Sequence, residues 1–222
     1  MWKPILRQFQ FEYADGYLFW DKAGRVARDL AQAIPGLQLR NQLIDQRDFF
    51  LPGSTLELFF GIRLASVSSW EEDGAEFRRK ASLLLEILSH ELELDALTRF
   101  QFLCSLGWPC QTHEEAHALA MKLLPREVTQ NLETGEFLGA QLEVRKGAIL
   151  GTTRYAIMEL SPPPGPVRPD ALGPRIPFVI ASVFHNCFET VPVREFKATA
   201  VLEDMEQRFI AEMSKQINSP AL

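Results

Sequence analysis

The chain has 222 residues, of which 46% are hydrophobic and 23% are charged, as is typical of a globular protein with one large domain or two small ones. Its net charge of −6 argues against a broad nucleic-acid-binding surface, because phosphate recognition needs a basic stripe. No apolar run approaches the ~20 residues that span a bilayer, so we expect no membrane segment.

Alternating apolar residues predict strands in the first half of the chain, and apolar residues at helical spacing predict helices. Arg7 is the exception to the alternation in the first strand. Proline and glycine at 35–36 and 52–53 mark the end of a helix and a turn. The predicted elements are a strand at 5–13, a helix at 21–34, a weaker strand at 37–44, a strand at 55–67 and a helix at 76–90.

The second half of the chain begins with the same kind of alternation and ends on a long helix. We predict strands at 98–106, 137–144, 148–160 and 178–184, and helices at 112–124 and 194–213. The segment 161–177 holds seven of the chain's 14 prolines, and proline lacks the backbone N–H that a helix or inner strand needs. It is therefore expected to be an exposed connection between two strands.

The two halves share a pattern that suggests an internal duplication. In each, a Phe-Gln-Phe triplet lies on an alternating run, a Gly-aromatic pair follows, and a helical pattern then ends at a proline. Coincidence is the alternative, because short aromatic strands followed by helices are common. The matching residues are Phe9, Phe11, Gly16 and Pro35 in the first half and Phe100, Phe102, Gly107 and Pro125 in the second.

Together these patterns predict an α+β protein made of a duplicated strand–helix–(three to four strands)–helix unit. The halves would be residues 1–95 and 96–222, joined in one compact pseudo-dimeric domain. By pattern, the unit looks like a helix-grip or TATA-binding-protein-like arrangement, in which a curved antiparallel sheet carries its helices on one face. Such a likeness of fold carries no function with it.

One motif could carry chemistry. His113, Glu114 and His117 satisfy H-E-x-x-H, in which two imidazoles one helical turn apart bind zinc and the Glu activates water. The same letters also form a capping box, with Thr112 as N-cap and Glu115 at the third helical position. Because the cap accounts for these residues without a metal, we expect no zinc and keep the zinc hydrolase as the alternative.

The three cysteines, Cys104, Cys110 and Cys187, form neither an even disulfide framework nor a CxxC motif. Reduced thiols in a cytoplasmic protein are therefore expected. Cys187 and His185 supply the residue types of a cysteine–histidine nucleophile. A core cysteine and a histidine at the end of a strand are expected instead.

Several aromatic residues lie where alternation would place them away from the core, and they are candidates for interaction with a partner. They are Phe49, Phe50, Phe59, Trp70 and Trp108. Alternatively, the second face of the sheet is covered by helices of the other half or of another subunit. Stacking of bases on these rings is not expected in an acidic protein.

Trp70, Phe77 and the run Arg99-Phe100-Gln101-Phe102 also form a pattern of their own. An aromatic residue, a Phe heading a helix and an Arg-led aromatic strand resemble a sporadically distributed family of uncharacterised bacterial proteins of similar length. The resemblance implies a bacterial protein and supplies no catalytic residues.

The sequence therefore predicts a cytoplasmic, non-enzymatic binding protein that acts through a protein partner or as a homo-oligomer. The prediction depends on the lack of a convincing catalytic set and on apolar residues at nominally outer strand positions. The alternative is a zinc-dependent hydrolase with His113 and His117 as ligands and Glu114 as general base.

Overall fold

A computed structural model of the chain describes residues 2–14, 16–70, 73–124, 140–146, 149–160 and 176–218. The first half contains one strand, one helix, four strands and a second helix. These are β1 (Lys3–Tyr13), α1 (Phe19–Ala33), β2 (Gln38–Gln42), β3 (Gln46–Phe50), β4 (Glu57–Gly61), β5 (Leu64–Trp70) and α2 (Gly74–Glu91).

In the described residues, the second half has the same succession of elements, but its last strand has only two residues and is followed by a short 3₁₀ helix. They are β6 (Ala96–Pro109), α3 (His113–Leu123), β7 (Ala140–Lys146), β8 (Ile149–Leu160), β9 (Ile176–Cys187), β10 (Val191–Pro192), the 3₁₀ helix Val193–Glu195 and α5 (Ala198–Asn218). The exposed connection predicted for 161–177 lies outside the described residues, except for Ile176 and Pro177 in β9.

The strands form one 10-stranded sheet in the order β2-β3-β4-β5-β1-β6-β9-β8-β7, with β10 paired to β6. Every pairing among the described strands is antiparallel. The first strand of each half lies in the middle of the sheet. There β1 and β6 pair so that Phe9 is opposite Phe102, Gln10 opposite Gln101 and Phe11 opposite Phe100.

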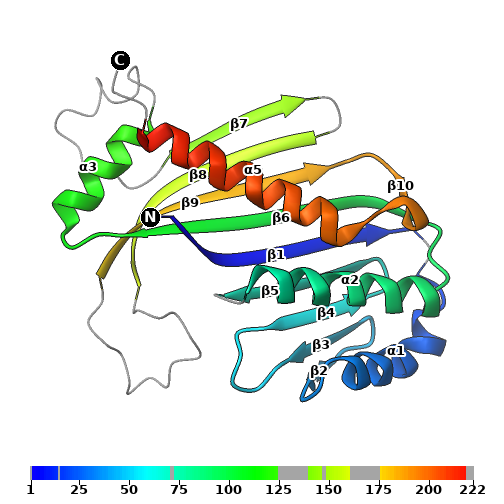
Figure 1. The fold of residues 1–222 in the computed structure, drawn as a ribbon. Coiled ribbons are helices and arrows are strands. Elements are labelled where there is room, and N and C mark those ends of the chain that lie inside the picture. Colours follow the sequence, from blue (N-terminus) through cyan, green and yellow to red (C-terminus); the bar gives the residue numbers. More distant parts are fainter. Residues whose placement is uncertain are drawn as a thin grey trace.

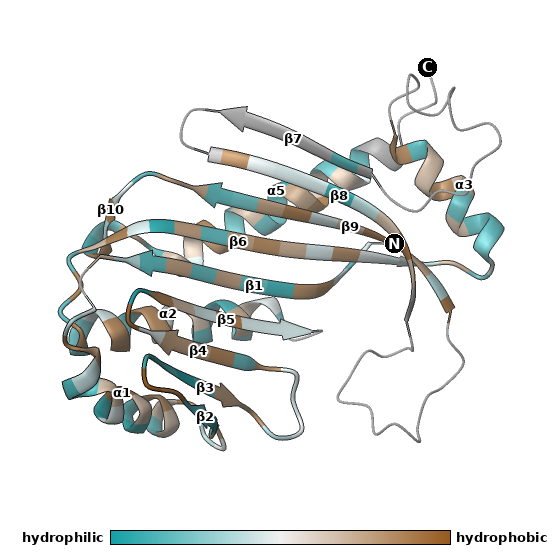
Figure 2. Cartoon of the chain, turned by 180° about the vertical axis from the view of Figure 1, so that it is seen from behind, coloured by the Kyte–Doolittle hydropathy of each residue, from teal (hydrophilic) through white to brown (hydrophobic). Residues whose placement is uncertain are grey.

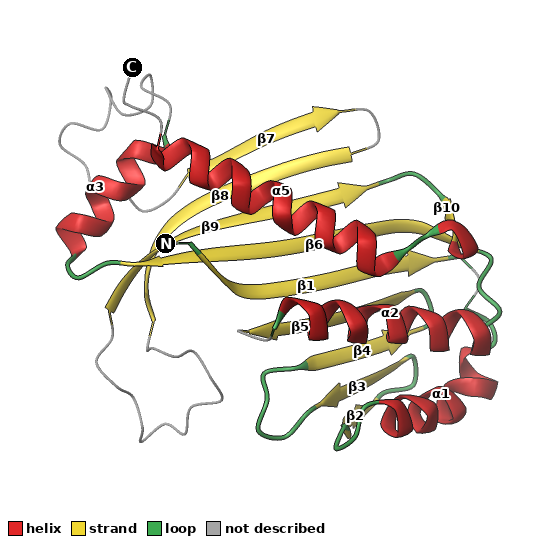
Figure 3. Ribbon diagram, viewed as in Figure 1, coloured by secondary structure: helices red, strands yellow, loops and turns green. Residues whose placement is uncertain are grey.

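The four described α-helices lie on one face of the sheet (Figures 1 and 3). Their buried residues join those of the strands in a single apolar core, in which Phe9, Phe11 and Phe102 are fully buried. Phe196, just before α5, stacks on Phe9 with 5.9 Å between ring centroids. The mixed α+β class and the antiparallel sheet that the sequence predicts are therefore confirmed.

The single strand predicted at 55–67 is wrong. The chain turns at Ile62 and Arg63, so β4 and β5 are two strands of a hairpin. The turn shifts the alternation by one residue: Leu58 and Phe60 face the core in β4, whereas Ala65 and Val67 do so in β5.

The two glycines of the repeated pattern differ in local structure. Gly16 lies in the loop after β1, where a Cβ atom would be 1.4 Å from the carbonyl oxygen of Ile62. Gly107 lies within β6, opposite Ile180. The two Phe-Gln-Phe triplets thus lie on corresponding strands, β1 and β6. The two glycines do not correspond, because one lies in a loop and the other lies within a strand.

None of the helices in the described part of the chain combines the length and the apolar character needed to cross a membrane.

Candidate binding surfaces

The face of the sheet opposite the helices is not covered by any helix among the described residues (Figure 2). Strand pairing places Phe50, Phe59 and Trp70 on this face, because their chain neighbours point into the core. Trp70 is 40% exposed, and Phe50 and Phe59 are half-buried. We call this surface, defined by these three residues and the strands around them, the open face.

The other two aromatic candidates point toward the helices. Phe49 is 3% exposed and stacks on Phe60 with 5.9 Å between ring centroids, so it belongs to the core and has almost no surface to offer a partner. Trp108 is half-buried and makes an edge-to-face contact of 5.6 Å with Trp2, which is itself buried.

Arginine side chains lie over phenylalanine rings on the open face. Arg40 is 5.0 Å from the centroid of Phe50 and also pairs with Glu57 at 2.7 Å. Farther along the sheet, Arg154 lies 4.7 Å from the centroid of Phe184. Aromatic residues and arginine are the types enriched at protein–protein interfaces.

A shallow hollow of about 310 Å³ lies on the open face where β1 to β5 run side by side. Its lining is mostly polar, with Gln8, Asp48 and Ser66 beside the ring of Phe59. Gln8 donates a hydrogen bond to the hydroxyl of Ser66 at 3.3 Å. The centre of the open face is thus polar, with aromatic rings at its side.

A second, small group of buried apolar side chains lies at one end of the sheet. Ile5, Phe178 and Ile180 form a small cluster that is separate from the main core. Gly107 lies beneath them, and a Cβ atom there would be 3.1 Å from Ile5 and Phe178. These three side chains are 5%, 8% and 5% exposed, so the cluster fills space at this end of the sheet and leaves little apolar surface for a partner.

The H-E-x-x-H stretch forms the first turn of α3, and Thr112 is the N-cap as predicted. The Thr112 hydroxyl accepts a hydrogen bond from the backbone N–H of Glu115 at 3.2 Å. The Glu115 carboxylate in turn accepts one from the backbone N–H of Gln111 at 2.7 Å. The helix start is thus fixed by two reciprocal hydrogen bonds, one residue displaced from the usual capping box.

Few potential zinc ligands lie near the H-E-x-x-H stretch in the described residues. His113 and Glu114 are exposed and His117 is half-buried. Within the described residues, no three His, Cys, Asp or Glu side chains are grouped as metal ligands would be. Hydrogen bonds from its own backbone N–H and from the Thr112 hydroxyl lower the pKa of the Glu114 carboxyl, whereas a general base benefits from a pKa near the working pH.

His185 and Cys187 lie on β9, opposite Phe102 and Phe100, and so face the helices. Cys187 is buried at 6% exposure. Burial lowers the pKa of His185, and the nearby Glu212 carboxylate opposes that effect. Burial also raises the pKa of the Cys104 thiol to about 12, so this thiol is unreactive near neutral pH.

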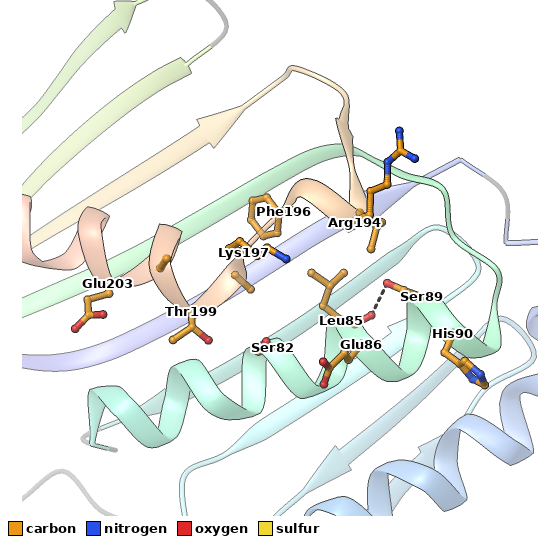
Figure 4. Close-up of a pocket in the computed structure, with 13 residues that line it drawn as sticks. Ser82, Leu85, Glu86, Ser89, His90, Arg194, Phe196, Lys197, Thr199 and Glu203 are labelled. Atoms are coloured by element: carbon orange, nitrogen blue, oxygen red, sulfur yellow. Dashed lines mark hydrogen bonds between the residues drawn. The ribbon is translucent and has the colours of Figure 1, made fainter.

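Sequence patterns missed a groove between α2 and the start of α5 (Figure 4). It has a volume of about 680 Å³, within the range of ligand-binding sites. Leu85 and Phe196 contribute apolar surface, and Glu86 and Lys197 contribute charges. Its walls come from elements more than 100 residues apart, so no local motif marks it.

A buried ion cluster fastens both of these helices to the sheet. Arg7 on β1 pairs with Glu206 on α5 at 2.6 Å, and Arg78 on α2 reaches the same carboxylate at 3.2 Å. Arg7 and Glu206 are 6% and 5% exposed. The Arg78 Nε atom is buried and has no hydrogen-bond partner within the described structure.

No protein-family model matches the chain, and no curated protein matches it either. The resemblance to the bacterial family therefore stays a prediction.

Proposed function

We propose that the protein is a non-enzymatic binding protein that contacts a protein partner, or a second copy of itself, through the open face of the sheet. One observation carries the proposal: all the described helices lie on one face, and the other carries the exposed Trp70 with the half-buried Phe50 and Phe59. Aromatic side chains left partly exposed together on one surface are typical of interaction sites.

The chemistry of the open face favours a protein over other occupants. Its partly exposed rings, Trp70, Phe50 and Phe59, suit hydrophobic side chains. Its polar centre offers amide and hydroxyl groups, such as Gln8 and Ser66, for hydrogen bonds. A nucleic acid would require an excess of basic residues, whereas the chain carries a net charge of −6.

Replacement of Trp70 tests this proposal, with Trp20 as the matched control. Trp20 is more exposed, at 60%, but lies on α1 on the other side of the sheet. Light scattering after gel filtration should give a mass above the 25.2 kDa of one chain, or affinity capture should identify a partner. Trp70→Ser should abolish that association, whereas Trp20→Ser should preserve it.

A clean monomer that captures no partner would overturn the proposal. So would an association that Trp70→Ser leaves intact.

The proposal extends to the architecture. An internal duplication into residues 1–95 and 96–222 is supported by the central pairing of β1 with β6, where Gln10 meets Gln101. It is also supported by the order of the strands. From the middle of the sheet outward, the first half runs β1, β5, β4, β3, β2, and the second half runs β6, β9, β8, β7. In this view the unit is a helix-grip-like sheet, and the two halves form a pseudo-dimer in a bacterial cytoplasmic protein.

A further inference from the structure

The groove between α2 and α5 continues beyond its main hollow. A smaller hollow of about 290 Å³ shares Ser82 and Glu86 with it, and one of about 570 Å³ at the opposite end shares Val193 and Arg194. At 1.5 Å per residue, the lining along α2 from position 75 to 90 is about 22 Å long. That length matches a helix of about 15 residues.

The floor of the groove is apolar and fixed in place. Leu85 and Phe196 are almost buried, at 4% and 8% exposure, and Val193 and Ala200 leave more of their apolar surface open. The Phe196 ring is held between Phe9, at 5.9 Å, and Phe100, at 4.8 Å. A partner would therefore meet a surface that needs little reordering on binding.

Two charges of opposite sign stand on opposite walls. Glu86 projects from α2, and Lys197 projects from the residue before α5 (Figure 4). Both side chains are exposed, and within the described part of the chain neither side chain makes an ion pair or a hydrogen bond. Glu203, farther along α5, is partly neutralised by Arg78 at 3.6 Å.

We propose that this groove binds an amphipathic helix of a partner protein. The apolar stripe of that helix would pack on Val193 and Ala200, which are the more exposed apolar residues of the lining, above the almost buried Leu85 and Phe196. An acidic residue on one flank would face Lys197, and a basic residue on the other flank would face Glu86. An apolar stripe with charges on both flanks is the pattern of an amphipathic helix, whereas an extended peptide alternates between two faces.

This site goes beyond the proposed function and is independent of it. The groove is lined by α2 and the start of α5, which lie on one face of the sheet (Figure 1), and strand pairing places Trp70 on the other face. Loss of association in the Trp70 variant and loss of helix binding at the groove are therefore separate results, and either can fail without the other.

A phage-displayed library of helical peptides of about 15 residues, panned on the full chain, tests the proposal. Selected peptides should share apolar residues at i, i+3, i+4 and i+7, with an acidic and a basic flank. Thr199→Trp, which fills the groove from an exposed position, should weaken their binding at least about tenfold. Ala211→Trp, on an exposed face of α5 outside the groove, should change it by less than about twofold.

Exchange of the two wall charges provides a second readout. The double variant Lys197→Glu with Glu86→Lys should lose the selected peptides and bind peptides whose flanking charges are exchanged. Failure to enrich any helical peptide would overturn the proposal. So would peptides without helical periodicity, or binding that Thr199→Trp leaves unchanged.

Discussion

Arg7 and Glu206 are 199 residues apart in the chain, yet Arg7 donates two hydrogen bonds to the Glu206 carboxylate, at 3.0 and 2.6 Å. The pair joins the first strand of the protein to its last helix. Arg78 on α2 donates to the same carboxylate at 3.2 Å. One buried anion thus holds α2, α5 and the middle of the sheet together.

Glu206→Ala should lower the free energy of unfolding by about 3–5 kcal/mol, because it removes the buried carboxylate to which Arg7 and Arg78 both donate. Urea unfolding followed by circular dichroism measures the loss. The double variant Arg7→Met with Glu206→Met should lose much less than the two single variants combined, since no uncompensated charge remains at Arg7. Additive losses would contradict a direct coupling of the two groups.

Gly16→Ala should destabilise the protein severely, because a Cβ at this position would lie 1.4 Å from the backbone oxygen of Ile62. Neither backbone segment can move away without disturbing β1 or the β4–β5 turn. Gly24→Ala is the matched control: it lies on α1 with no atom within 4 Å of the new Cβ. This change should stabilise the protein by up to about 1 kcal/mol through helix propensity. Thermal unfolding of both variants distinguishes the effects.

The sequence predicted those parts of the fold that local patterns determine. Phe9, Phe11, Phe100 and Phe102 alternate with polar residues, and all four prove to be buried on the helix side of the sheet. The helical stripe predicted at 76–90 matches α2, and Thr112 was identified as an N-cap from its chemistry alone. In each case the residues that decide the structure are close together in the chain.

Features that depend on distant residues could not be predicted. Arg7 breaks the apolar alternation of β1 because it pairs with Glu206. Glu206 is far from Arg7 in the sequence, so no local pattern could predict this pairing. The β4–β5 turn was missed because Ile62 and Leu64 continue the apolar alternation through it. The groove between α2 and α5 exists only once the two helices have packed on the sheet.

Stability should fall as the pH drops below 6.5, in part through His185. Burial lowers the pKa of this histidine from its ordinary value of 6.5, Glu212 opposes the effect and Arg208 reinforces it. The unfolded chain therefore takes up a proton at a higher pH than the folded protein does, so acid favours unfolding.

His185→Gln should flatten the fall in unfolding free energy as the pH passes below 6.5, the ordinary pKa of histidine. Glu212→Gln should steepen it, because the carboxylate that raises the His185 pKa is removed. Urea titrations at several pH values give the three curves. If the His185→Gln curve runs parallel to the wild-type curve, the burial of His185 does not contribute to the pH dependence.

Thr112→Ala should cost about 1 kcal/mol of stability, because the first turn of α3 loses the hydroxyl that accepts from the Glu115 N–H. Glu114→Ala should change stability little, since Glu114 is exposed and the variant keeps the Thr112 hydroxyl and the Glu115 carboxylate, which accept hydrogen bonds from the backbone of this turn. Unfolding in urea measures both variants. The contrast between neighbours in one turn separates the capping role from the catalytic one that H-E-x-x-H would assign to Glu114.

Metal analysis of the purified protein completes that test. If α3 serves as a capped scaffold helix, we expect no stoichiometric zinc, and a chelator should leave the unfolding curve unchanged. A zinc site would instead hold close to one ion per chain, with both imidazoles about 2.0–2.1 Å from it. Glu114→Ala would then keep the metal but abolish hydrolysis, because that Glu acts on water and does not bind zinc. Stoichiometric zinc lost on replacing His113 or His117 would overturn the non-enzymatic proposal, whatever the Trp70 variant does to association.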